Sequence, residues 1–184
     1  SVINYASAFV DNINSYAQSL RSQQKDANTE IESMVKKINS IGDQIVALNK
    51  QIYSVELDGS HANDLRDQRA LLIDELSQYV NTDVRTIDTE YGEKLIVLVN
   101  GQDLVNHFDN NKIECVERKD SEKLNDDDAP GLYDLVWRSG PSFITTGLSG
   151  ELKGLLDVRD GNDGNNNTPS YKGIPYYIEK MNTL

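Results

Sequence analysis

Apolar residues return at alternating steps of three and four along the first third of this chain. The repeat runs from residue 3 to residue 55, and only one of its positions, Gln24, is polar. A repeat held for this length predicts one helix with a narrow apolar stripe that needs helical partners along its length. At about 1.5 Å per residue the helix would be about 80 Å long. We therefore expect an elongated helical rod rather than a compact globule.

The second half of this helix carries the largest aliphatic side chains of the stripe and forms a candidate helix-packing seam. Each of these side chains would contribute about 1.5–3 kcal/mol on full burial. Gln24, in the first half, would fix the register of packing at some cost in stability. The seam residues are Ile31, Met34, Ile38, Ile41, Ile45, Leu48 and Ile52.

Turn-forming residues at 56–60 end the long helix, and a second amphipathic helix follows through Val80. The short connection makes the two helices antiparallel neighbours, so the second should lie against residues 38–55 of the first. It can cover less than half of the first helix. The stripe over residues 3–34 therefore needs another partner, either the C-terminal segment or another chain.

Charges of alternating sign open the second helix. Asn63, or Ser60 before it, would cap the helix, while Asp64 and Asp67 lie near the positive end of its dipole and Arg69 follows within reach. One interpretation is capping with surface ion pairs, worth about 1 kcal/mol or less. The other is a clasp that holds the tip of the helical hairpin.

From about residue 83 the pattern changes to that of strands, expected at 84–90, 94–99, 102–108, 112–118 and 132–138. Asn100-Gly101 predicts a tight type I′ hairpin between the second and third. Helices return at 150–159 and after Pro175. The fold class is therefore α+β, with residues 1–82 and 147–184 forming a helical rod domain and residues 83–146 a small antiparallel β domain.

Composition and motifs argue against nucleic-acid binding, membrane binding, metal binding and catalysis. The formal charge of −12 leaves no basic stripe for nucleic acid and disfavours an anionic membrane surface. The single cysteine, Cys115, excludes an internal disulfide. The oxygen-rich residues 160–166 do not fit an EF-hand loop, and the acidic run at 126–128 is expected to be solvated. We therefore expect that the protein is not an enzyme and that it has no cofactor and no metal site.

Several short motifs follow one another in a specific order over nearly the whole chain. They are Ile38-Asn39, Leu48-Asn49-Lys50-Gln51-Ile52, Ala62-Asn63-Asp64-Leu65-Arg66-Asp67-Gln68-Arg69, Asn100-Gly101-Gln102-Asp103-Leu104-Val105, Gly154-Leu155-Leu156 with Arg159-Asp160, and Ile174-Pro175. In this order they resemble the family of first-type hook-associated proteins of bacterial flagella, which form the junction between hook and filament.

The resemblance implies a secreted structural subunit of the extracellular flagellum that is exported without a cleaved signal and assembles into a ring. Its implied partners are further copies of itself, the hook protein, the next hook-associated protein on the filament side and an export chaperone. The helical terminal segments of the family are missing, so the chain is expected to be an internal fragment. The alternative hypothesis is a cytoplasmic coiled-coil adaptor that forms a parallel dimer. An enzyme is the third hypothesis.

Overall fold

The computed structural model describes residues 1–161 and 173–184, which form two compact units. Unit 1 contains residues 1–32, 117–134 and 154–184, and unit 2 contains residues 33–116 and 135–153. Each unit is thus built from segments that lie far apart in the sequence. The sequence predicted a different kind of division, into a helical rod domain (residues 1–82 and 147–184) and a β domain (residues 83–146) that would each fold on its own. That division stays a prediction.

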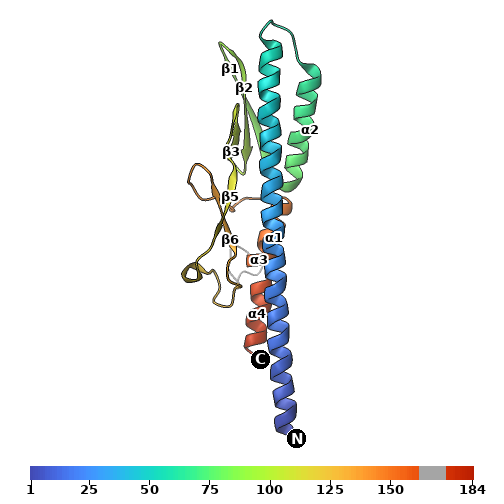
Figure 1. Ribbon diagram of the computed structural model, residues 1–184, viewed down its shortest axis with the longest axis vertical. Helices are drawn as coiled ribbons and strands as arrows, with labels where there is room; N and C mark the ends of the chain where they lie inside the picture. The colour runs from blue at the N-terminus through green and yellow to red at the C-terminus, as the bar shows by residue number, and fades with distance from the viewer. Residues whose placement is uncertain (162–172) are drawn as a thin grey trace. The chain divides into compact units, whose positions relative to one another are not determined.

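The long helix predicted from the heptad repeat is confirmed. Helix α1 (Val2–Glu56) is uninterrupted over 55 residues (Figure 1). It contains no proline, and its only glycine is Gly42, so nothing in its interior breaks the hydrogen-bond ladder. Just beyond its end, Gly59 has a positive φ of 86°, a conformation that favours glycine and turns the chain toward the second helix.

The remaining elements confirm the α+β class. In the described residues, helix α2 follows α1, and five short strands, a 3-10 turn, a sixth strand and two further helices come next. Their bounds are α2 (Asn63–Tyr79), β1 (Thr82–Thr89), β2 (Gly92–Val99), β3 (Gln102–Asn106), β4 (Asp109–Asn110), β5 (Ile113–Glu117), η1 (Asp120–Glu122), β6 (Tyr133–Trp137), α3 (Glu151–Asp160) and α4 (Ile174–Asn182).

The four-stranded antiparallel sheet of unit 2 has the order β1-β2-β3-β4. Its central hairpin pairs Val99 with Gln102, and the two turn residues Asn100 and Gly101 both have positive φ, 48° and 78°. The predicted type I′ turn is therefore confirmed. The buried side chains come from the inner strands, with Val97, Val99 and Leu104 fully covered.

One sequence expectation about the strands needs correction. The strands were expected to form one sheet, but β5 pairs only with β6, in a separate two-stranded sheet. The side-chain amide of Asn39 on α1 explains the break: it accepts from the N–H of Ile113 at 2.9 Å and donates to the C=O of Ile113 at 2.8 Å. Asn39 therefore occupies the backbone groups that a neighbouring strand would need.

The helical hairpin also has the predicted antiparallel geometry. Near the turn, Leu48 and Ile52 of α1 pack with Ala62 and with Leu65 of α2. At the other end of α2, the Lys37 ammonium lies 4.9 Å from the centre of the Tyr79 ring. Contacts at both ends of α2 place it against the second half of α1.

A close backbone approach follows the hairpin and generates a stability prediction. Gly150 has φ of 98°, and a Cβ there would lie 2.7 Å from the carbonyl oxygen of Tyr79. Gly150→Ala should therefore lower the free energy of unfolding by about 2–4 kcal/mol, because it adds a clash with backbone to the strain of positive φ. Urea denaturation followed by circular dichroism measures the loss.

Gly92→Ala is the matched control for Gly150→Ala. Gly92 has a similar φ of 106°, but nothing lies within 4 Å of its added Cβ. This variant carries the backbone strain alone and should lose less stability than Gly150→Ala. Equal losses in the two variants would contradict the importance of the close approach.

Candidate functional site

The predicted seam is buried by the chain itself. Ile31, Ile38 and Ile45 have no exposed surface, Ile41, Leu48 and Ile52 are buried, and Met34 is half-buried. Because they are largely covered by their own chain, these residues hold the fold of their own units together. Their role in contacts between copies stays a prediction. Most of the large exposed apolar side chains of α1 lie instead in its first turns.

Gln24 lies in the centre of unit 1 and is fully buried. Its Nε2 donates to Asp128 Oδ1 and to the carbonyl of Arg159, both at 2.9 Å, and its Oε1 accepts from the N–H of Ala129 at 2.8 Å. The side chain is therefore satisfied by two segments of its own chain, and its polarity has a local structural reason.

Asn28, one turn further along α1, continues this polar network. Its Oδ1 accepts from the N–H of Tyr133 at 2.9 Å and from Arg159 Nη1 at 2.8 Å. The Arg159 guanidinium is buried and also donates to Asp160 at 3.0 and 2.7 Å. Gln24 and Asn28 are four residues apart on one face of α1, so this spacing is the sequence signal that could have revealed the network.

The expectation that the acidic run at 126–128 is solvated is wrong for Asp128. Its side chain is 1% exposed and lies 4.0 Å from Arg118. Burial raises the pKa of the Asp128 carboxyl, and nearby Asp160 also raises it, while the hydrogen bond from Gln24 acts in the opposite direction. Asp127, in contrast, is about half exposed and contacts Arg21 at 3.6 Å.

Arg118 is the second buried guanidinium of unit 1. It donates to Asp134 Oδ1 at 3.0 and 2.8 Å, and its Nη2 lies 3.7 Å from Asp160. Burial lowers the pKa of Arg118, but its acidic neighbours outweigh this effect, so the pKa is raised overall. Arg118 therefore remains charged, and its carboxylate partners fix the loop that follows β5.

The four clasp candidates in unit 2 have different environments. Asn63, Asp64 and Asp67 are exposed, and the capping position belongs to Ala62, whose side chain makes no capping hydrogen bond. The expectation that Asn63 or Ser60 caps α2 is therefore not met. Only Arg69 is buried.

Arg69 joins α2 to α1 through a side-chain amide. Its Nη1 donates to Asn49 Oδ1 at 2.9 Å, and Asn49 Nδ2 donates to the carbonyl of His107. Arg69 Nη2 also lies 3.9 Å from Glu93. The chain of contacts thus connects α2, α1 and the turn after β3.

A second ion pair, absent from the sequence prediction, closes the tip of the hairpin. Arg66 donates to both carboxylate oxygens of Glu56, at 3.0 and 2.6 Å, and the N–H of Ala62 points to Glu56 Oε2 at 3.4 Å. The hydrogen bond from Arg66 is the main reason that the pKa of Glu56 lies below its usual value. Glu56 and Arg66 are therefore the residues that clasp the end of α1 to the start of α2.

The first turns of α1 present a different surface. Their large apolar side chains are exposed, in contrast to the buried seam. We call this set the N-terminal stripe; its members, with exposed fractions, are Val2 (84%), Ile3 (80%), Tyr5 (79%), Phe9 (55%), Val10 (53%) and Tyr16 (62%).

The described residues contain neither a membrane-spanning helix nor a cluster of metal-binding side chains. Within residues 1–161 and 173–184, no helix combines the length and apolar character needed to cross a bilayer. The same part of the chain holds no group of three or more His, Cys, Asp or Glu side chains able to bind a metal ion. The oxygen-rich segment considered for calcium lies largely outside the described residues.

Comparisons with known proteins agree with this architecture. The family described as "Flagellar hook-associated protein FlgK helical domain" matches residues 1–171. "Flagellar hook-associated protein 1" of Bacillus subtilis is 34% identical over 105 residues, which are 57% of this chain and 20% of that protein. The protein of the same name from Salmonella typhimurium is 36% identical over 107 residues, 57% of this chain and 19% of that protein.

A solved structure shows the same fold. The flagellar hook junction protein FlgK from Burkholderia pseudomallei aligns with a TM-score of 0.64 at 24% identity, covering 82% of this chain and 26% of that chain. The chain thus spans about a fifth of the length of the curated relatives that it matches.

Replacing Gln24 separates the two explanations of its polarity. Heptad packing alone predicts that Gln24→Leu stabilises the protein. The structure instead predicts that Gln24→Leu lowers the free energy of unfolding by about 2–4 kcal/mol. Asp128, Ala129 and the Arg159 carbonyl would lose the Gln24 amide, their buried hydrogen-bond partner. Urea denaturation measures the change. Gln23→Leu, at an exposed neighbouring position, should stay within about 0.5 kcal/mol of the original.

The clasp residues can be tested in the same way. Arg69→Met should lower the free energy of unfolding by about 1–3 kcal/mol, because Asn49 Oδ1 loses its buried donor. Asn63→Ala should leave the thermal midpoint unchanged, since no side-chain cap is lost. A clear drop in the midpoint for Asn63→Ala, with none for Arg69→Met, would reverse this assignment.

Proposed function

Because this chain belongs to the family of the FlgK helical domain of flagellar hook-associated proteins, we propose that it is part of a structural subunit joining the flagellar hook to the filament. In this proposal the subunit acts outside the cell as a building block that assembles by helix packing. The partners proposed for the whole subunit are other copies in a ring, the hook protein, the next hook-associated protein and an export chaperone. Catalysis has no part in this function.

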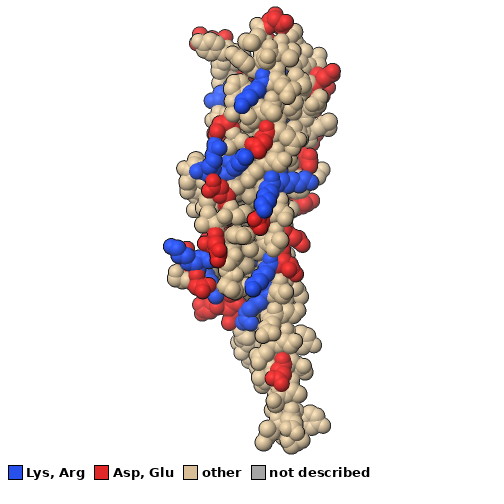
Figure 2. Space-filling model, viewed as in Figure 1, with Lys and Arg blue, Asp and Glu red and all other residues tan. Residues whose placement is uncertain are grey.

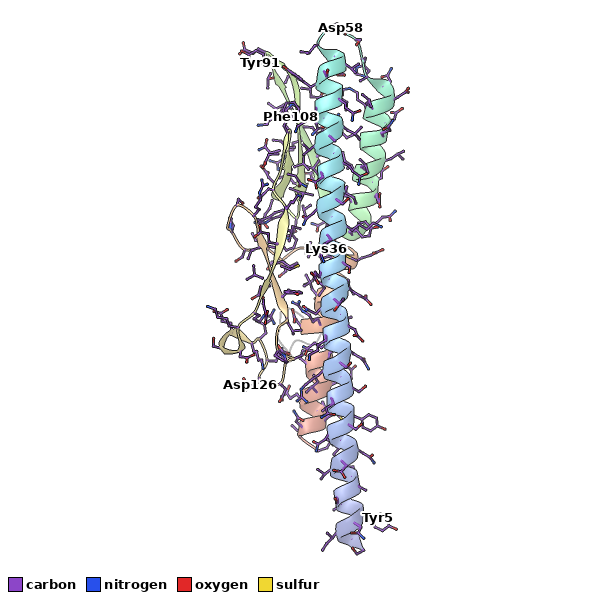
Figure 3. The ribbon with its side chains drawn as sticks, viewed as in Figure 1. Tyr5, Lys36, Asp58, Tyr91, Phe108 and Asp126 are labelled. Atoms are coloured by element: carbon purple, nitrogen blue, oxygen red, sulfur yellow. The ribbon has the colours of Figure 1, made fainter. Side chains whose placement is uncertain are left out.

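The observation that carries the proposal is the exposed N-terminal stripe. Ile3 and Val10 occupy heptad positions whose later equivalents are buried further along α1, and Val2, Tyr5, Phe9 and Tyr16 lie beside them on the helix; all six are 53–84% exposed. In Figure 3 the Tyr5 side chain points away from α1, with no other side chain of the helix covering it. Exposed apolar surface of this extent on a helix is typical of a site that packs against another protein segment.

The charge distribution supports the same conclusion. Asp11 is the only charged residue among residues 1–20. Figure 2 shows this end of α1 almost entirely without Lys, Arg, Asp or Glu, although both signs cover the neighbouring stretches of the chain. Burying this surface in an assembly would desolvate hardly any charge, which keeps the cost of association low.

The alternative function, a cytoplasmic coiled-coil adaptor, receives less support. A parallel dimer of that kind needs its heptad seam free along the helix. Here the buried positions extend from Ala17 to Ile52, so a long dimer would require the chain to release its own core. The first turns of α1 do offer exposed apolar side chains, but they are too short for such a dimer.

A charge placed in the N-terminal stripe tests the proposed function. In a flagellated host whose only copy of the gene carries Phe9→Glu, we expect lost or strongly reduced swimming, because a buried unpaired carboxylate opposes assembly. Ser15→Glu is the control, since Ser15 is exposed and lies about 120° around α1 from Phe9. Swimming-zone diameter and electron microscopy of filaments measure the outcome. Normal filaments with Phe9→Glu would contradict the proposal.

A further inference from the structure

The turn between β2 and β3 contains the one Asn-Gly pair of the chain, Asn100-Gly101. Asparagine amides are chemically labile, and they react most easily before glycine, because glycine has no side chain to hinder approach to its backbone nitrogen. In this reaction the Gly101 nitrogen attacks Asn100 Cγ, the new C–N bond forms as the Cγ–Nδ2 bond breaks, and ammonia leaves with the proton of the Gly101 amide. Water then opens the cyclic imide to aspartate or isoaspartate. The pair is therefore a candidate modification site.

The fold holds the side-chain amide of Asn100 by hydrogen bonds at both of its ends. Its Nδ2 donates to the carbonyl groups of Ile144 at 2.8 Å and Thr146 at 3.1 Å, and its Oδ1 accepts from Asn81 Nδ2 at 3.1 Å. Gly101 is exposed, so water already reaches the turn. To bring Cγ to bonding distance of the Gly101 nitrogen, the amide must leave these partners. The hydrogen bonds that order the turn therefore oppose the reaction.

The segment that receives these bonds, residues 144–149, is tied to the same end of the sheet by two further side-chain amides. The N–H of Ile144 donates to Gln102 Oε1 at 3.0 Å, and the N–H of Ser149 donates to Asn81 Oδ1 at 2.9 Å. All of these bonds can break without disturbing the strands, because none of them belongs to a β ladder. A local opening of this segment, rather than unfolding of the whole unit, is therefore the event that would release the amide.

Conversion at position 100 would prevent the segment from closing again. Aspartate has no NH2 group, so a carboxylate oxygen would replace the donor that lies 2.8 and 3.1 Å from the carbonyl oxygens of Ile144 and Thr146. These oxygens carry negative charge or partial negative charge and repel one another. Isoaspartate also adds a methylene group to the backbone, which does not fit a two-residue turn that pairs Val99 with Gln102.

We propose that Asn100 is a deamidation site that the fold keeps closed, and that its conversion makes a local opening of residues 144–149 permanent. The modification needs no enzyme, because the Gly101 nitrogen and water supply the reacting atoms. Asn81 is the positioning residue of the site, since its side chain holds both the Asn100 amide and Ser149. This inference goes beyond the proposed function, because it concerns the lifetime of unit 2 and not the contacts of the N-terminal stripe.

Ageing of the full-length subunit tests the site. The purified protein is kept at mildly alkaline pH, either native or unfolded in guanidinium chloride, and conversion at Asn100 is followed by peptide mass spectrometry that separates the isoaspartate form. We expect conversion to be several-fold slower in the native protein. Asn81→Ala should bring the native rate toward the unfolded rate, because the amide loses a tether. Gly92→Ala is the control, since it strains the opposite end of β2 and leaves the tethers in place.

Three outcomes of the ageing experiment would overturn the proposal. Equal rates in native and unfolded protein would mean that the fold does not protect Asn100, and a lack of conversion in both would mean that it is not a deamidation site. Equal acceleration by Asn81→Ala and Gly92→Ala would mean that global stability, and not the tethers, controls the rate.

Asn100→Asp tests the permanent opening without ageing. Hydrogen exchange of residues 144–149 at neutral pH should be several-fold faster in this variant than in Asn100→Gly. Glycine also lacks the side-chain hydrogen bonds and accepts the positive φ of the turn, but it adds no charge beside the two carbonyl groups. Equal exchange in the two variants would contradict the repulsion on which the permanent opening depends.

Discussion

Side-chain amides on α1 are the interactions on which the arrangement of the other segments depends. In unit 2, Asn49 bonds the backbone of His107 and Asn39 bonds that of Ile113; in unit 1, Gln24 bonds Ala129 and Asn28 bonds Tyr133. Apolar packing along a heptad stripe is tolerant of sliding, whereas an amide that satisfies a specific backbone group is not. These four residues therefore set where the returning chain meets the helix, while the aliphatic side chains supply the larger share of the burial energy.

The buried charges have a role that the apolar core cannot fill. Arg159 and Arg118 in unit 1 each contact more than one acceptor, and Arg69 does the same in unit 2. A planar guanidinium with several donors can join segments that have no regular secondary structure to pair. Removing one partner from such a group leaves a buried charge or acceptor, so these contacts specify the geometry of the loops more than they add to stability.

The sequence predicted the elements well because their signals are local. The uninterrupted repeat in α1 and the positive-φ pair Asn100-Gly101 each act within a few residues, and the structure has both. The failures concern partners that are distant in sequence. Asp128 was assigned to solvent because a charged run in a loop usually is, and only the fold brings Gln24 and Arg118 to it. Glu56 and Arg66 were overlooked for the same reason: ten residues separate them, and a turn must form before they meet.

A heptad repeat also carries no information about which of its turns the chain will cover itself. Ile3 and Ile31 occupy the same position of the repeat, but the first is 80% exposed and the second fully buried. The distinguishing signal lies in the polar residues around the stripe. Gln24 and Asn28 accompany the covered part, where returning segments bring backbone groups that need amide partners. Residues 1–20, in contrast, carry a single charged side chain, Asp11. The exposed apolar residues of the first turns, with a single charged side chain among residues 1–20, are the reason why we propose this end of α1 as a surface for another molecule.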